Sequence, residues 1–95
     1  MTHELKIWPQ HFGAVARRHK NYELRLNDRN YQVGDYLILR EFIPIPDHYK
    51  GDLMPVSKQY TGKELKRKIA HILTDEVPGL SPGHVILGFT PPPPA

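Results

Sequence analysis

The stretch that decides the fold runs from Arg17 to Asp35 and reads RRHKNYELRLNDRNYQVGD. Its NYELRLN segment alternates polar and apolar residues, which predicts a half-buried strand with Tyr22, Leu24 and Leu26 on one face. We expect the Tyr22 ring to lie in the core because it shares this face with two leucines. The stretch also carries five Arg or Lys side chains. The strand therefore either forms a solvated edge or faces a negatively charged ligand.

The composition indicates one small domain. The chain has 95 residues, of which 39% are hydrophobic and 24% charged, as in an ordinary globular protein. We expect a single domain over residues 1–90 and a disordered, proline-rich tail over residues 91–95. The chain has no cysteine, which excludes disulfides and zinc sites of the cysteine type. No apolar run approaches the ~20 residues of a membrane span, and the first residues do not resemble a signal peptide, so we expect a cytoplasmic protein with no membrane association.

Other segments predict an α+β fold. HELKIW, YLILREF and HVILGF have strand patterns, and Pro9 can open a short helix that ends near Arg18. The prolines between Ile43 and Gln59 predict a long loop. TGKELKRKIAHILTD is ambiguous, because its apolar spacing and a capping box favour a helix while a strand also fits. Four or five strands with one or two helices predict a sheet curled into a small barrel.

The charge distribution gives a first indication of function. The net charge is +3 and the isoelectric point about 9.3, which weakly indicates a nucleic-acid partner. One basic cluster lies in the opening stretch and a second in KQYTGKELKRK, where Glu64 is the one acid. The two clusters either meet on one face or form two separate solvated faces.

One motif resembles a known superfamily. RHKNYELR is similar to the G-x-K-x-x-E-x-R signature of the ASCH superfamily of PUA-like barrels, with Lys20, Glu23 and Arg25 at its charged positions and Arg18 in place of its glycine. HELKIWP, NDRNYQVGDYLILREF, YTGKEL and PGLSPGHVILG resemble an uncharacterised bacterial and phage family of PUA-like proteins. The resemblance implies a PUA-like β-barrel of about five strands with one or two flanking helices. It also implies a strand in KRKIAHIL, which we adopt over the helix.

The resemblance further implies a ligand cleft beside the signature strand. Arg25 can clamp a phosphate, Lys20 adds a point charge, and Glu23 can accept a hydrogen bond from the exocyclic amine of a base. The alternative is a simple ion pair between Glu23 and Arg25, worth ~0.2–1 kcal/mol if exposed.

Further contacts are expected from basic and aromatic residues. Tyr60 is the preferred exposed ring for stacking on a base, whereas Trp8 suits stacking and packing on the helix equally. The predicted nucleic-acid-binding residues are Lys20, Glu23, Arg25, Arg29, Lys58, Tyr60, Lys63, Lys66, Arg67 and Trp8. The loop from Ile43 to Gln59 is expected to close over the cleft. The histidines form no close ligand pair, so we expect no metal and no cofactor.

Three functions agree with these features. The first is a monomeric, non-enzymatic module that binds single-stranded RNA, another single-stranded nucleic acid or a modified nucleoside. The second is an enzyme, either a ribonuclease or a small hydrolase of N-acylated cytidine in which Lys20 and Glu23 transfer protons. The deacylating relatives use a hydroxyl residue where this chain has Glu23, and Ser57 and Thr61 are the candidate substitutes. The third is a bacterial or phage regulatory protein that binds a host protein.

Overall fold

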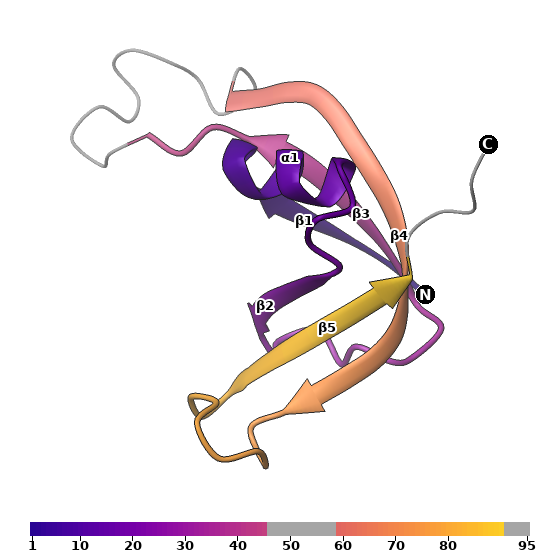
Figure 1. Cartoon of the computed structure of the whole chain (residues 1–95), viewed down its shortest axis with the longest axis vertical. Helices are drawn as coiled ribbons and strands as arrows, with labels where there is room; N and C mark the ends of the chain where they lie inside the picture. The colour runs from indigo at the N-terminus through magenta and orange to yellow at the C-terminus, as the bar shows by residue number, and fades with distance from the viewer. Residues whose placement is uncertain (46–58, 91–95) are drawn as a thin grey trace.

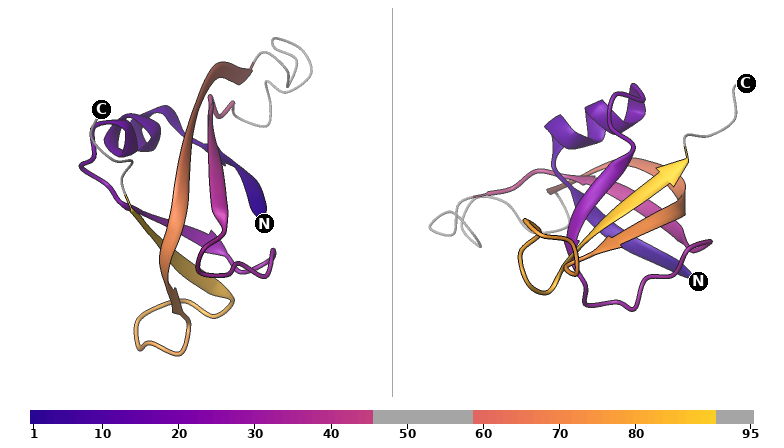
Figure 2. Two further views of the ribbon diagram at one scale, coloured as in Figure 1. Left: turned by 90° about the vertical axis from the view of Figure 1, so that its right-hand side faces the viewer. Right: turned by 60° about the horizontal axis from the view of Figure 1, so that its bottom comes forward.

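The computed structural model describes residues 1–45 and 59–90, which form one five-stranded sheet and one α-helix. The elements in chain order are β1 (Thr2–Ile7), α1 (Pro9–Ala16), β2 (Tyr22–Leu26), β3 (Tyr36–Phe42), β4 (Tyr60–Thr74) and β5 (His84–Thr90). The strand order is β1-β3-β4-β5-β2; β1 runs parallel to β3 and the other pairs are antiparallel. The sheet curls into a half-barrel and α1 packs on its core beside β3 (Figures 1 and 2), which confirms the predicted small α+β barrel. Among the described residues, no helix has the length and apolar character to cross a membrane.

The long strand β4 gives the sheet its curl. Its first part pairs with β3 and its second part with β5, so it bends across the molecule in Figure 1. The register with β5 shifts between Ile69 and His71, which marks a β-bulge. The shift moves the inward-facing positions by one residue, so Leu65, Ile69 and Ile72 all pack on the core. This strand with one bulge therefore has the apolar spacing of a helix, and the choice of a strand is confirmed.

The core lies on the concave face of the sheet. Leu37, Leu39 and Leu87 have no exposed surface, and α1 adds the buried side chains of Phe12 and Val15. Pro9 occupies the first turn of α1, where backbone N–H groups have no acceptor within the helix, so its missing N–H costs no hydrogen bond. The ends of the segment between β3 and β4 are joined, because Ile43 N donates to Gln59 O at 2.9 Å.

The two faces of β2 are the reverse of those expected. Tyr22, Leu24 and Leu26 are 52%, 54% and 58% exposed, whereas Glu23 is only 5% exposed. The prediction of Tyr22 in the core is therefore wrong. The inner face of β2 looks toward the open side of the half-barrel, where Glu23 lies between Lys20 and Arg25. These two cations offset the cost of burying its carboxylate.

A buried polar cluster joins β1 to the start of β3. Asp35 accepts hydrogen bonds from His3 Nε2 at 2.8 Å, from Gln32 N at 3.1 Å and from the Met1 amino group at 3.1 Å. The His3 hydrogen bond, aided by the Met1 amino group and Gln32 N–H, lowers the pKa of Asp35 to about 2 although burial opposes the shift. The Tyr31 ring meets the His3 ring edge-on, with centroids 4.8 Å apart.

Asp35→Asn should lower the stability of the protein at neutral pH. It should also make the stability fall less between neutral and acidic pH. Because the pKa of Asp35 is lower in the folded chain, the ionised carboxylate stabilises the fold above the unfolded pKa of about 4. That contribution is lost as the pH falls from about 4 to about 2. Urea unfolding followed by circular dichroism across this range measures the effect, with Asp28→Asn as the exposed control. An unchanged acid dependence in Asp35→Asn would refute the role assigned to Asp35.

Candidate nucleic-acid interface

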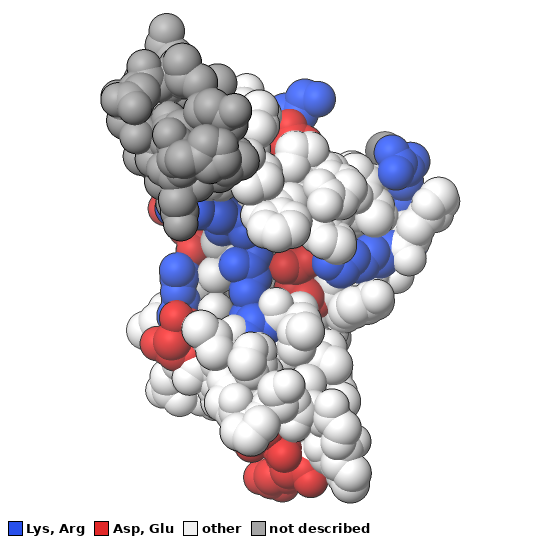
Figure 3. Space-filling view, turned by 90° about the vertical axis from the view of Figure 1, so that its left-hand side faces the viewer, with Lys and Arg blue, Asp and Glu red and all other residues white. Residues whose placement is uncertain are grey.

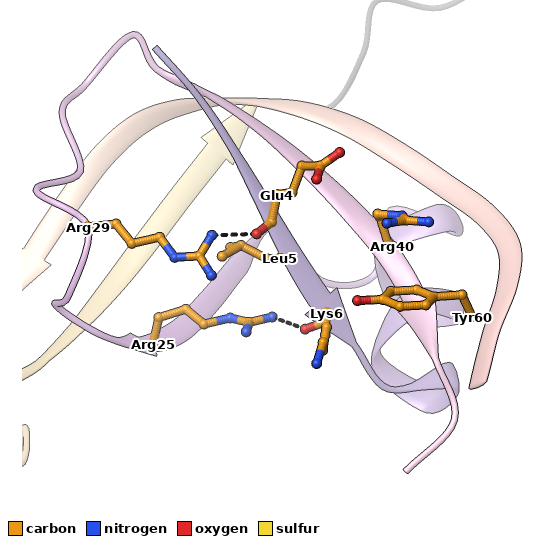
Figure 4. A pocket seen from close by; sticks show the side chains of 7 residues that line it. All are labelled: Glu4, Leu5, Lys6, Arg25, Arg29, Arg40 and Tyr60. Carbon is orange, nitrogen blue, oxygen red and sulfur yellow. Dashed lines mark hydrogen bonds between the residues drawn. The ribbon is translucent and has the colours of Figure 1, made fainter. Parts of the chain in front are cut away.

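The open side of the half-barrel lies between the edges of β1 and β2, which are the two outer strands of the sheet. Two arginines cross this gap from β2 and the residues after it (Figure 4). Arg25 Nη2 donates to the backbone oxygen of Lys6, and Arg29 Nη1 donates to that of Glu4. Side chains rather than a backbone ladder therefore join the two edges of the sheet.

Three neighbouring hollows follow this gap, and we call them together the β1–β2 groove. The largest, about 320 Å³, is lined by Glu4, Leu5, Lys6, Arg25, Arg29, Arg40 and Tyr60. The second, about 310 Å³, is lined by Lys6, Ile7, Trp8, His11, Glu23 and Arg25. The third, about 140 Å³, is lined by Leu5, Arg25, Leu26, Asp28, Arg29 and Tyr31. Arg25 borders all three, and Figure 3 shows basic side chains gathered along a hollow with acidic ones beside them.

The largest hollow carries an excess of positive charge. Four cations, Lys6, Arg25, Arg29 and Arg40, line it together with one carboxylate, that of Glu4. Three of these cations also meet carboxylates outside the lining: Arg25 meets Glu23 at 3.2 Å, Arg29 meets Asp28 at 4.0 Å and Arg40 meets Glu64 at 3.7 Å. An arrangement of this kind focuses a positive potential and attracts anions. Its volume lies at the lower end of the range for small-molecule sites, roughly 300–1,000 Å³.

Two signature residues, Glu23 and Arg25, line the second hollow, and the third, Lys20, contacts Glu23. Lys20 Nζ lies 2.6 Å from Glu23 Oε1, and Arg25 Nε donates to Glu23 Oε2 at 3.2 Å. Arg25 follows Glu23 by two residues, so both side chains share one face of β2. Lys20 reaches them because the chain turns after α1, where Arg18, two residues beyond the end of the helix, has a φ of 64°. The result is a carboxylate held between two cations beside the groove.

Two aromatic rings border the groove. Trp8 is half-exposed just before α1, and its ring stacks on His11 with centroids 6.3 Å apart. Tyr60, the ring expected to be most exposed, is half-buried, and the Arg40 guanidinium lies 4.1 Å from its ring centre. Trp8 is thus the ring with more free surface for a base.

The other predicted contact residues lie elsewhere. Lys63 and Lys66 are exposed on β4 and line none of these hollows; Lys66 Nζ lies 4.4 Å from the ring centre of Tyr36. Lys58 and most of the loop expected to close over the cleft fall outside the described residues.

Arg67 is buried and joins β4 to the end of α1. It is only 6% exposed, and its Nη2 donates to the backbone oxygen of Val15 at 3.3 Å. The oxygen lies near the C-terminal end of α1, where a cation is favourable. Burial, and then the nearby Arg18, lower the pKa of Arg67. We therefore leave Arg67 out of the candidate site.

Sequence reasoning missed Lys6, Arg40 and His11. The alternation of HELKIW does place Lys6 on its polar face. No sequence signal shows, however, that β1 pairs in parallel with β3 and leaves its other edge facing β2.

The fold and the groove define a small half-barrel domain with a basic opening between its edge strands. Residues 2–89 match the family described as a domain of unknown function, DUF3850, and the chain belongs to this family. A segment of 41 residues is 44% identical to the "Uncharacterized 12.9 kDa protein in GpA 3′ region" of Escherichia phage P2. The match covers 43% of this chain but only 38% of the phage protein, well under two thirds of its length. Both findings agree with the predicted bacterial and phage family.

Proposed function

We propose that this protein is a nucleic-acid-binding module that takes single-stranded RNA in the β1–β2 groove. The observation that carries the proposal is the convergence of Lys6, Arg25, Arg29 and Arg40 on one hollow whose lining includes one carboxylate, that of Glu4. We also place the family in the ASCH superfamily of PUA-like barrels. In support, the signature residues Lys20 and Arg25 both contact the third, Glu23, beside this groove.

The groove offers a distinct partner to each part of a nucleotide. Arginine guanidinium groups bind phosphate oxygens through paired hydrogen bonds. The half-exposed Trp8 ring offers a stacking surface, and stacking contributes about 1–3 kcal/mol per base. Glu23 borders the same hollow as Trp8, so its carboxylate can accept a hydrogen bond from the exocyclic amine of a stacked base.

A fluorescence anisotropy titration tests the proposal. Labelled single-stranded RNA, single-stranded DNA and duplex DNA are each titrated with the full chain at low and physiological salt. We expect the single-stranded RNA to bind most tightly, with a dissociation constant below ~10⁻⁶ M, the tight end of non-specific binding. Equal binding of all three near ~10⁻⁴ M at physiological salt would refute the proposal.

The affinity for RNA should also depend steeply on salt. Each phosphate contact releases counterions and contributes about −0.7 to the slope of log affinity against log salt concentration for a single strand. Four contacts, one for each cation of the large hollow, give a slope of about −3. Lys68→Ala removes an exposed charge that lies outside the groove, so its slope should match the unmodified protein. A salt-insensitive affinity would contradict the proposed contacts.

A second candidate is a hydrolase of N-acylated cytidine, favoured by the 2.6 Å contact between Lys20 and Glu23. A lysine and carboxylate in contact can transfer protons during hydrolysis. Of the two candidate hydroxyls, that of Thr61 donates to Glu41 at 2.7 Å and lines none of the described hollows, and Ser57 lies outside the described residues. Release of acetate from N-acetylcytidine, abolished in Glu23→Gln, would support this candidate. Prolonged incubation without product would eliminate it.

A further inference from the structure

Arg25 and Arg29 bind to the edge of β1 at a spacing that defines the ligand more closely. We propose that Arg25 and Arg29 bind two consecutive phosphates of one strand, so that the groove selects a polynucleotide backbone over a nucleoside or mononucleotide. The inference rests on the proposed function and names the ligand class of the same groove.

The strand β1 sets the distance between the two guanidinium groups. Arg25 is anchored on the Lys6 oxygen and Arg29 on the Glu4 oxygen, two residues earlier on the same strand. A strand advances ~3.3 Å per residue, so these oxygens repeat at ~6.6 Å along the same edge. Successive phosphates of an extended single strand are separated by a similar distance. The backbone of β1 thus spaces the two cations to match one strand of nucleic acid.

Both anchored guanidinium groups keep free donors. Arg25 uses Nε and Nη2 for Glu23 and Lys6, which leaves both N–H bonds of Nη1. Arg29 gives one bond from Nη1 to Glu4, and its contact with Asp28 is a loose 4.0 Å. The side chains are 24% and 45% exposed, so an incoming phosphate can reach the free donors.

The β1 backbone adds N–H donors at the same two-residue spacing as the arginine anchors. The N–H and C=O groups of one strand residue project to the same side. Because the oxygens of Glu4 and Lys6 face the groove, their amide N–H groups face it too. An anion beside each arginine therefore meets a backbone donor at the same position along the strand.

The order of the hollows fits a chain that follows β1. Arg29 lies opposite Glu4 and Arg25 opposite Lys6, and Trp8 follows at the end of the strand. A base on Trp8 beside Glu23 would thus be followed by phosphates at Arg25 and then Arg29. The Asp28 carboxylate lines the hollow beyond and repels a further phosphate there. Arg25 and Arg29 accordingly fix two of the bound phosphates in a defined register, while Lys6 and Arg40 remain for others.

Three short oligocytidylates of equal length, whose bases carry the exocyclic amine expected at Glu23, test the inference with the full chain. The first keeps all phosphates charged. The second keeps two adjacent charged phosphates, and the third keeps two that are separated by one neutral methylphosphonate; all other linkages are neutral. The second and third probes have equal net charge, so a difference between them measures the spacing alone.

We expect the adjacent pair to bind about tenfold more tightly than the separated pair. Arg29→Ala should abolish this difference, whereas Lys68→Ala should preserve it. Equal affinity for the second and third probes would overturn the inference, and so would a difference that survives in Arg29→Ala. In either case, binding of the fully charged probe would still uphold the proposed function. Failure of the fully charged probe to bind would overturn both.

Discussion

Replacement of both Arg25 and Arg29 by alanine should lower the affinity for single-stranded RNA about hundredfold at low salt. Each guanidinium is anchored on a backbone oxygen of β1 and turns further N–H groups toward the groove. Charge-assisted hydrogen bonds contribute roughly 1.5–3 kcal/mol when shielded from water. Because both side chains are partly exposed, we take the low end, which corresponds to about tenfold for each arginine.

Two controls separate this loss from misfolding and from net charge. Lys68→Ala removes one positive charge from β4 outside the groove and should change the affinity less than about threefold at physiological salt. Arg25→Lys keeps the charge but loses the planar fork, so it should retain part of the affinity. Anisotropy titrations measure each variant after circular dichroism has verified its fold. A double variant that binds as tightly as the unmodified protein would refute the groove as the binding site.

Leu87→Ala should destabilise the protein by about 2–5 kcal/mol, whereas Leu24→Ala should cost less than about 1 kcal/mol. Leu87 has no exposed surface on β5, so its truncation leaves a cavity in the core. Leu24 lies on the adjacent strand β2 but is 54% exposed on the outer face. Urea denaturation compares the two identical substitutions. Similar free-energy losses would contradict the assignment of the two faces of β2.

The orientation of β2 shows what alternation alone leaves open. The pattern in NYELRL correctly predicts a strand whose faces differ, but the apolar face is the exposed one. The reason is local, because Lys20 and Arg25 compensate the Glu23 carboxylate on the inner face. Burial of a charged side chain depends on partners that strand periodicity does not describe.

The strand β4 shows a second limit. Its apolar residues follow helical spacing because a bulge between Ile69 and His71 shifts the inner face by one position. Resemblance to a family of barrels resolved the ambiguity where periodicity could not. The bulge depends on the tertiary structure of the bent sheet, and no residue type in KIAHIL indicates it in the sequence.

The candidate site was partly predictable. The signature residues Lys20, Glu23 and Arg25 lie within five positions of each other in the sequence, so local structure brings them together. Lys6 and Arg40 join them only through the strand order, which places β1 at the edge that faces β2. Their contribution depends on contacts between distant segments, which one sequence without its fold does not reveal.

Nuclear magnetic resonance of the ¹⁵N-labelled chain during titration with single-stranded RNA shows whether the RNA binds in the β1–β2 groove. We expect the largest amide shifts at Glu4, Lys6 and Arg25, along the edges of the β1–β2 groove. The outer face around Tyr36, Lys66 and Lys68, which also combines an aromatic ring with cations, provides the internal comparison. Shifts centred on that outer face, or no shifts at saturating RNA, would rule out the groove as the RNA-binding site.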